Sequence, residues 1–161
     1  MGPTTYRGWI LPAMLAVLAG GCGDSFTQGR EPGGSRVTRP NTWKLSGDLS
    51  NLPNAVDNSF DTVATSGKSY LGDAVTVDLG APCLLNLVVM THGTTHQDGH
   101  PRRVALDVSL DGDKFKKVSE VSGTRRVTAI LIVTPTLARY IRLRAVEEGS
   151  EPWAIAELVV Q

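Results

Sequence analysis

The stretch V-A-L-D-V-S-L-D-G-D-K-F at residues 104–115 carries the most direct information about the fold. Apolar and polar residues alternate from Val104 to Leu110, which is the period of a strand with one buried face. Asp111-Gly112 follows, a dipeptide that favours a tight turn, and a second run begins at Phe115. The stretch therefore predicts a β-hairpin.

Short runs of the same kind lie on both sides of this hairpin. Residues 84–90 form an apolar run interrupted only by Asn86, as expected for a strand buried on both faces, whereas residues 74–79 alternate. The predicted strands are 74–79, 84–90, 104–110, 115–121, 127–133, 139–145 and 154–160. No window has a sustained helical period. About eight short strands predict an all-β domain, a two-sheet sandwich or jelly roll.

Composition limits the classes of partner. The chain has 161 residues, enough for one domain with its own core. Its 16 basic and 16 acidic residues cancel, so no net charge attracts a nucleic acid, and we expect no nucleic-acid partner.

The first 21 residues are typical of a signal peptide. Arg7 is followed by the apolar run Ile10–Ala19, which is too short to cross a bilayer. The sequence L-A-G-G-C resembles the lipobox of bacterial lipoproteins, with Leu18 one position early, so Cys22 is the predicted lipidation site. The alternative is an ordinary signal peptide cleaved near Gly21, with Cys22 incidental.

We therefore expect three segments: a lipoprotein signal peptide at 1–21, a flexible tether at 22–40 and a folded domain at 41–161. The tether is rich in Gly, Ser, Arg, Thr and Pro and has few residues that could build a core. Stable anchoring needs more than one acyl chain, which the lipobox would supply. The protein is expected to be exported and anchored to a membrane of the bacterial cell envelope.

Five strings in fixed order carry a family resemblance: A-V-D-N-S-F-D-T, V-T-V-D-L-G, V-S-L-D-G-D-K-F, A-R-Y-I-R-L and A-E-L-V-V. Together they resemble the discoidin or coagulation factor 5/8 type C domain family, which overlaps with the family 32 carbohydrate-binding modules. The resemblance runs from about Trp43 to the end of the chain and implies a galactose-binding-like jelly roll. Two features depart from it: Val63 stands where the family often has Trp, and the cysteines of the animal members' terminal disulfide are absent.

The first string, Ala55–Thr62, concentrates the oxygen ligands that Ca²⁺ prefers. The resemblance implies a structural Ca²⁺ held by the side chains of Asp57, Thr62 and Glu157 and by backbone carbonyls near Ala55 and Ser59. A carboxylate inside the apolar run at 154–160 needs a partner, and a cation would supply one. The alternative is an Asx-type turn, with Glu157 bonded to backbone amides or to Arg142.

The loop at residues 91–103 holds all three histidines, His92, His96 and His100. Their spacing would align them on a helix for zinc, but the glycines and Pro101 of this loop disfavour a helix. The resemblance implies sugar recognition by a His and an Arg on loops, for which His92 and Arg102 match best and Arg103 is the alternate. A solvated loop without function is the other interpretation.

Two aromatic residues are candidates for stacking on a sugar ring. Trp153 precedes the last strand in a polar loop, and Tyr70 is predicted to be an exposed aromatic in a second loop. Trp153 could equally plug the end of the sandwich. Trp43 and Cys83 are expected in the core.

No nucleophile, metalloprotease or phosphate-binding motif occurs in the sequence. We therefore expect a non-catalytic, membrane-tethered module that binds carbohydrate through loops at one end of the sandwich. The alternative is a structural or adhesion module that contacts protein in an envelope assembly.

Overall fold

The computed structural model of the chain describes residues 37–161. The predicted signal peptide, Cys22 and most of the predicted tether lie outside these residues. The elements are η1 Pro40–Thr42, β1 Lys44–Gly47, η2 Leu52–Val56, β2 Ala64–Thr65, β3 Ala74–Thr91, β4 Arg103–Ser109, β5 Lys116–Ser122, β6 Val127–Glu147, β7 Ala154–Ile155 and β8 Glu157–Val160. Within this part of the chain, no helix has the length and apolar character needed to cross a bilayer.

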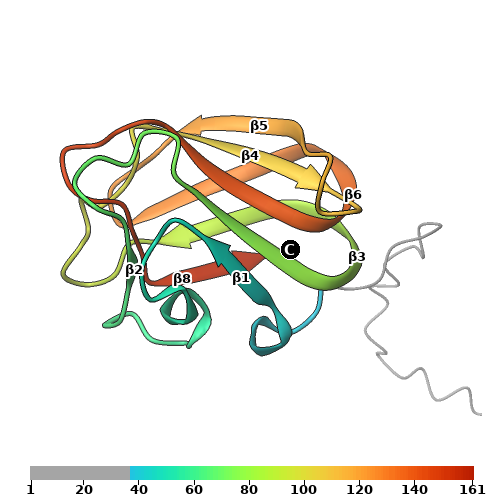
Figure 1. Cartoon of the computed structure of the whole chain (residues 1–161), viewed down its shortest axis with the longest axis horizontal. Helices are drawn as coiled ribbons and strands as arrows, with labels where there is room; N and C mark the ends of the chain where they lie inside the picture. Colours follow the sequence, from blue (N-terminus) through green and yellow to red (C-terminus); the bar gives the residue numbers. More distant parts are fainter. Residues whose placement is uncertain (1–36) are drawn as a thin grey trace, which may run out of the picture. The chain divides into compact units, whose positions relative to one another are not determined.

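Two long strands, β3 and β6, organise the molecule. They pair antiparallel along their length, with a break in register between Asp78 and Cys83, and Figure 1 shows both strands turning back at one end. The sheet order is β1-β3-β6-β4-β5, and β8 pairs with the second half of β3. The four runs predicted at 74–79, 84–90, 127–133 and 139–145 are therefore halves of two strands that serve both layers of the sandwich.

The predicted hairpin is confirmed as β4 and β5. Ser109 Oγ accepts hydrogen bonds from the amides of Asp111 and Gly112, at 3.2 and 3.0 Å. Gly112 has φ +81°, and a Cβ there would lie 3.1 Å from the ring of Tyr140. The turn therefore uses glycine both for its backbone conformation and for close packing on β6.

The core lies between the two layers and contains Trp43 and Cys83, as predicted. Alternation along the strands places one side chain in two inside. Its largest fully buried aliphatic side chains are Leu79, Leu85, Met90, Leu106, Ile130, Ile141, Leu143, Ile155 and Leu158.

One layer presents apolar side chains to solvent. On β6, Thr128, Ile130 and Ile132 are buried, whereas Leu131 is 63% exposed and Val133 is 91% exposed. The prediction that residues 84–90 are buried on both faces is wrong for their outer side chains, because Leu87 and Val89 are only half-buried and Asn86 is exposed. This apolar face comprises Leu87, Val89, Val127, Leu131, Val133 and Val159.

Candidate functional site

Three loops meet at the end of the sandwich away from the bends of β3 and β6. They are residues 92–102, 123–126 and 148–153, and backbone hydrogen bonds join them. The amide of His92 donates to Arg126 O and that of Arg126 to Gln97 O, both at 2.9 Å. The amide of Ala154 donates to Gly99 O at 2.8 Å. Main-chain pairing of this kind fixes the loops on a rigid scaffold, which suits a binding site.

A cleft of about 550 Å³ opens between these loops. Most of its lining side chains are polar. The lining residues are Thr94, Thr95, His96, Gln97, Asp98, Gly99, Arg125, Ser150, Glu151 and Pro152. Arg125 Nε lies 3.1 Å from Asp98 Oδ1, and the two side chains are 61% and 56% exposed. The cleft thus offers a cationic donor, a carboxylate acceptor and several hydroxyl or amide groups to a polyhydroxylated ligand.

A residue with an exposed aromatic ring is joined to the cleft loop through its backbone. Phe60 is 57% exposed. Its carbonyl accepts the amide of Thr94 at 3.1 Å, and Thr94 Oγ1 donates to Asp61 Oδ1 at 3.0 Å. Because Thr94 lines the cleft, these bonds place the backbone of Phe60 next to its rim.

The prediction that His92 binds ligand is wrong, because its side chain is fully buried. Its Nδ1 lies 2.7 Å from Ala154 O and its Nε2 lies 2.9 Å from Thr128 Oγ1. Burial lowers the pKa of His92, and the nearby His100 acts in the same direction. His92 therefore joins the end of β3 to β6 and β7 as a neutral side chain, and it cannot reach a ligand in the cleft.

Trp153 and Tyr70 are also buried, so the prediction that Tyr70 is exposed is wrong, and so is the interpretation of Trp153 as a sugar-stacking ring. Their ring centroids lie 6.5 Å apart at 40°, and Trp153 exchanges hydrogen bonds with Ser66 through its backbone. Tyr70 OH accepts the amide of Gly149, and burial raises its pKa. Trp153 plugs the end of the sandwich, the alternative that the sequence left open.

Arg102 and Arg103 are exposed but lie outside the cleft lining. Arg102 Nη1 is 3.5 Å from Glu147 Oε1, and Arg103 pairs with Glu120. The loop predicted for recognition therefore does line the cleft, but through residues 94–99 in place of the histidine and arginines named from the sequence.

The predicted calcium turn brings its side chains together. Asp57 accepts the amide of Ser59 at 2.9 Å and the hydroxyl of Thr62 at 2.7 Å. Glu157 Oε1 accepts the same Ser59 amide at 3.0 Å. Burial raises the pKa of Glu157, and the charge of Asp57 acts in the same direction. These bonds are those of the predicted Asx-type alternative, although Arg142 bonds to Asp107 and has no role there.

The donor set of this turn suits a hard cation. Two carboxylates and a hydroxyl meet, and no Lys or Arg of residues 37–161 forms an ion pair with Asp57 or Glu157. Ala55 is buried beneath the turn, so only its backbone is available. Within the described residues no group of three His, Cys, Asp or Glu side chains could hold a metal. A bound ion would therefore depend on neutral oxygens as well as on the two carboxylates.

Arg125, Asp98 and Phe60 were not singled out from the sequence. Asp98 lies inside the loop at residues 91–103, which the sequence did single out. Arg125 lies on the connection between β5 and β6, far away in sequence. Phe60 is hidden inside the predicted calcium string. A signal for Phe60 exists in principle, because an aromatic inside a run of turn-forming polar residues has no strand period to bury it.

Comparisons with known proteins agree with this fold. The family model of the F5/8 type C domain matches residues 36–158. No curated protein sequence matches the chain. Among solved structures, the CBM32-5 module of a Clostridium perfringens protein in complex with GalNAc-β-1,3-galactose has a TM-score of 0.68 and 22% identity, covering 78% of this chain and 99% of that module.

Two further C. perfringens structures are similar. The family 32 module of NanJ, in complex with galactose, has a TM-score of 0.67 and 18% identity over 76% of this chain and 95% of its own. The CBM32-1 module of a family 31 glycoside hydrolase has a TM-score of 0.63 and 20% identity over 75% and 94%. The predicted jelly-roll fold of about eight strands is confirmed by these likenesses and by the strands described above. Since the family model spans most of its length, the chain belongs to the F5/8 type C domain family.

Proposed function

We propose that the chain is a non-catalytic carbohydrate-binding module and that sugar occupies the cleft between residues 94–99, Arg125 and residues 150–152. The observation that carries the proposal is the exposed Asp98–Arg125 pair in a polar cleft. The related fold of modules solved with galactose and with GalNAc-β-1,3-galactose supports the same ligand class.

The chemistry of the cleft matches a sugar. Arg125 supplies planar N–H donors and Asp98 accepts from hydroxyl groups, so the pair can replace its internal bond with bonds to vicinal hydroxyls. Phe60 offers an exposed ring against which the apolar face of a pyranose can pack. Neither role needs covalent chemistry.

A glycan array with the full-length chain tests the proposal. We expect binding to a defined set of glycans, and we expect Arg125→Ala to weaken it by about 2 kcal/mol, or about thirtyfold, through loss of a charged hydrogen-bond donor. Phe60→Ala should weaken it as well. The matched control is Arg102→Ala, which removes an exposed arginine outside the cleft. Equal loss in Arg125→Ala and Arg102→Ala, or the absence of any glycan ligand, would contradict the proposal.

We also propose that the turn at Ala55–Thr62 takes Ca²⁺ through Asp57, Thr62 and Glu157, with backbone carbonyls near Ala55 and Ser59. The ion would neutralise two carboxylates that lack a cationic partner among the described residues, and it would join the turn to β8. A chelator should lower the melting temperature of the wild-type chain, because a ligand that binds only the folded state stabilises it. Asp57→Asn should remove this sensitivity, and a wild-type melting temperature that EDTA leaves unchanged would argue against the ion.

We also propose, from the lipobox-like sequence at the N-terminus, that the module is exported and membrane-tethered through Cys22. Metabolic labelling with a radioactive fatty acid tests it. Label should appear on the wild-type chain and disappear in Cys22→Ser, whereas label retained in the variant would exclude lipidation at this cysteine.

A second candidate function, contact with a protein in an envelope assembly, is favoured by the apolar face on β3, β6 and β8. Exposed apolar patches of this kind often mark protein contacts. Under this alternative, Val133→Ser would release the chain from an envelope complex isolated by cross-linking, and Arg125→Ala would not.

A further inference from the structure

The outer face of the other layer carries a buried carboxylate shared by two arginines. Asp107 on β4 has a side chain that is only 4% exposed. Its Oδ2 accepts Nε and Nη2 of Arg142, at 3.3 and 3.2 Å, and lies 3.5 Å from Nε of Arg144. Both arginines project from β6, two residues apart and therefore about 7 Å apart along the strand. One negative charge thus holds two positive charges in place.

The same ratio of one carboxylate to two cations recurs one strand further across the sheet. Glu120 on β5 pairs with Arg103 of β4 and, at 2.8 Å, with Lys117 of its own strand. Lys117 is the cross-strand partner of Asp107, and Asp107 is the partner of Arg142. The four cations Arg103, Lys117, Arg142 and Arg144, termed here the basic cluster, therefore lie on one face with two carboxylates among them.

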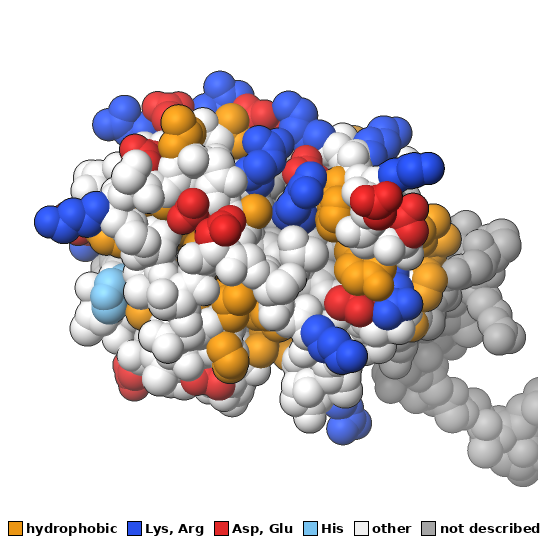
Figure 2. All heavy atoms as spheres, viewed as in Figure 1, with side chains coloured by type: hydrophobic (Ala, Val, Ile, Leu, Met, Phe, Trp, Pro, Cys, Tyr) orange, Lys and Arg blue, Asp and Glu red, His pale blue; other side chains and the backbone are white. Residues whose placement is uncertain are grey.

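This excess of charge is local, because the whole chain has no net charge. Figure 2 shows Lys and Arg side chains gathered over the part of this face where β4, β5 and β6 lie. The nearby acidic residues are otherwise engaged. Asp78 is held by Arg139 through two bonds at 2.8 and 2.9 Å, and Glu147, the cross-strand partner of Arg103, has its own cation in Arg102, whose Nη1 lies 3.5 Å from Glu147 Oε1. A locally positive potential remains over the basic cluster.

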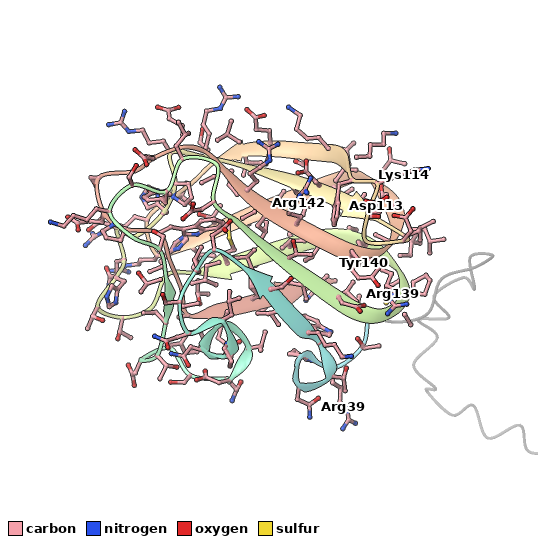
Figure 3. All side chains as sticks on the ribbon, viewed as in Figure 1. Arg39, Asp113, Lys114, Arg139, Tyr140 and Arg142 are labelled. Carbon is pink, nitrogen blue, oxygen red and sulfur yellow. The ribbon has the colours of Figure 1, made fainter. Side chains whose placement is uncertain are left out.

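The arginines are also held in a fixed orientation. The guanidinium of Arg142 lies 4.0 Å over the ring of Phe115, which adds a cation–π contact to its bonds with Asp107. Figure 3 shows Arg142 on this face of the sheet, apart from Arg139 and Tyr140. Within the described residues, most N–H groups of Arg142 and Arg144 have no protein acceptor. Donors fixed in this way bind an anion at a lower cost in side-chain entropy than freely moving ones.

Hydroxyl groups continue the face beside the arginines. Thr76 of β3 is the cross-strand partner of Arg142, and Ser46 of β1 is the partner of Thr76. A ligand along this row would meet charged donors over β6 and β5 and neutral hydroxyl groups over β3 and β1. That combination suits a polymer with both anionic groups and hydroxyl groups.

We propose that the basic cluster binds an acidic polysaccharide, through its carboxylate or sulfate groups, at a site separate from the loop cleft. The cluster and the cleft share no residue, because the cleft is lined by loop residues 94–99, 125 and 150–152. The inference does not depend on which sugar enters the cleft. It predicts that anionic and neutral glycans bind the same molecule at two places.

Three dextrans test the site, because they share one neutral backbone. Binding of the full-length chain to carboxymethyl dextran, dextran sulfate and unmodified dextran is measured by isothermal titration at low salt and at 0.3 M NaCl. We expect binding to the charged dextrans only, weakened by salt because solvent-exposed charges are screened. The two charged polymers distinguish carboxylate from sulfate as the preferred group.

Two variants locate the binding without unpairing Asp107. Arg103→Gln with Lys117→Gln should weaken binding about tenfold, the effect of about 1.4 kcal/mol for two lost charges. Arg142→Lys with Arg144→Lys keeps every charge but removes the planar guanidinium groups, and should weaken binding severalfold. The control is Arg39→Gln, an exposed arginine that Figure 3 shows away from Arg142. Urea unfolding confirms that each variant is folded.

The outcomes separate this proposal from the function of the cleft. Arg125→Ala should leave dextran sulfate binding unchanged, and the basic-cluster variants should leave binding to the neutral glycans of the array unchanged. The proposal is overturned if no charged dextran binds, if Arg39→Gln weakens binding as much as the cluster variants, or if the lysine variant binds like the wild type. If single-stranded DNA binds as tightly as the charged dextrans, the basic cluster is a site for polyanions in general and the proposal of a polysaccharide site is likewise overturned.

Discussion

His92 has its hydrogen-bonding capacity fully used inside the protein. A carbonyl oxygen can only accept, so Nδ1 carries the proton that is donated to Ala154 O, and the neutral ring accepts the hydroxyl of Thr128 at Nε2. A second proton would put a charge into a fully buried site and a donor against that hydroxyl hydrogen. Burial accordingly lowers the pKa of His92 below its ordinary value of 6.5.

This sets a pH dependence of stability. Because the folded-state pKa is lowered, the unfolded chain binds more protons as the pH falls below about 6.5, and the contribution of His92 is complete only above that value. We expect the free energy of unfolding, measured with urea at pH 8 and pH 5.5, to fall less in His92→Gln than in the wild type. The control is His96→Gln, which changes an exposed histidine. Its free energy of unfolding should fall as much as that of the wild type. An identical fall in His92→Gln would refute the assignment.

Exposure of single residues was the least predictable property from the sequence. Trp153 and Tyr70 sit among polar and turn-forming residues, which is typical of a surface loop, yet both are buried because two loops fold over the sandwich end and pack on each other. Local composition does not report this long-range packing. The oxygen-rich turn at Ala55–Thr62 was predictable, since Asp57 and Thr62 are bonded within the turn itself.

Among the elements, the loops at the cleft end are packed backbone against backbone. A Cβ at Gly149 would lie 2.1 Å from His100 O and 3.0 Å from Tyr70 OH. The carboxylate of Glu148 accepts the amides of Tyr70 and Leu71 and the hydroxyl of Ser69, and these bonds lower its pKa. The loop that contains Gly149 is therefore fixed on both sides.

Gly149→Ala should separate these loops. We expect it to lower the free energy of unfolding by about 2–3 kcal/mol, the usual cost of forcing a tightly packed site apart, and to weaken ligand binding at the cleft. Gly67→Ala is the control, because a Cβ there would meet only Ser69 O at 3.9 Å. Urea midpoints of the two variants give the comparison, and similar values for both would contradict the packing argument.

Strand positions were largely predictable, and strand continuity was not. The runs at 104–110, 115–121 and 154–160 correspond to β4, β5 and the β7–β8 region. Gly80 and Pro82 interrupt the strand period, so the sequence predicts a break between two strands at residues 79–83. Strand β3 instead continues through them with a register shift. Strands β1 and β2 were missed because Lys44–Gly47 is mostly exposed and Ala64–Thr65 is only two residues long.

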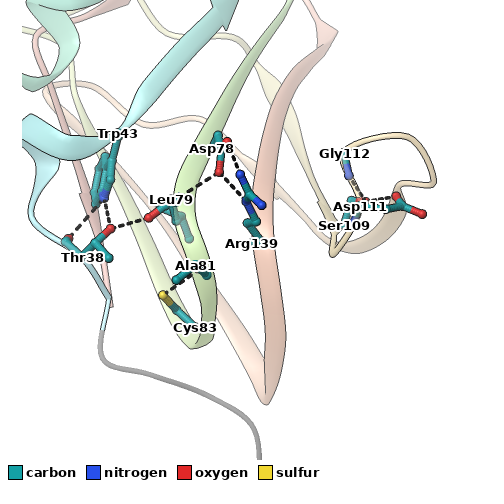
Figure 4. Close-up of polar contacts among 11 residues, drawn as sticks. Thr38, Trp43, Asp78, Leu79, Ala81, Cys83, Ser109, Asp111, Gly112 and Arg139 are labelled. Atoms are coloured by element: carbon teal, nitrogen blue, oxygen red, sulfur yellow. Dashed lines mark hydrogen bonds and ion pairs between the residues drawn. The ribbon is translucent and has the colours of Figure 1, made fainter.

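For the molecule as a whole, two buried tryptophans mark opposite ends of the sandwich. Trp43 donates through Nε1 to Thr38 Oγ1 at 2.9 Å, and Thr38 Oγ1 donates to Leu79 O, as Figure 4 shows at the bend of β3. Trp153 lies among the loops at the other end. Strands β3 and β6 run through both layers and pair along their length, so we expect the packing of the two ends to be coupled.

Unfolding should therefore be a single transition throughout residues 37–161. We expect Trp43→Phe and Trp153→Phe, each followed by the fluorescence of the remaining tryptophans and by circular dichroism in urea, to give coincident curves for the two probes within each variant. Each loses some stability, but the curves within a variant should not separate. Two distinct midpoints in either variant would mean that the ends unfold independently.

The attachment of Thr38 to Leu79 has a consequence for orientation. The described chain enters the sandwich at the bends of β3 and β6, whereas the cleft loops lie at the far end (Figure 1). Anything that holds the chain from its N-terminal side therefore pulls on the pole opposite the cleft. If the tether proposed above holds the chain from that side, the cleft would face away from the point of attachment, and a large ligand could approach it from the opposite side.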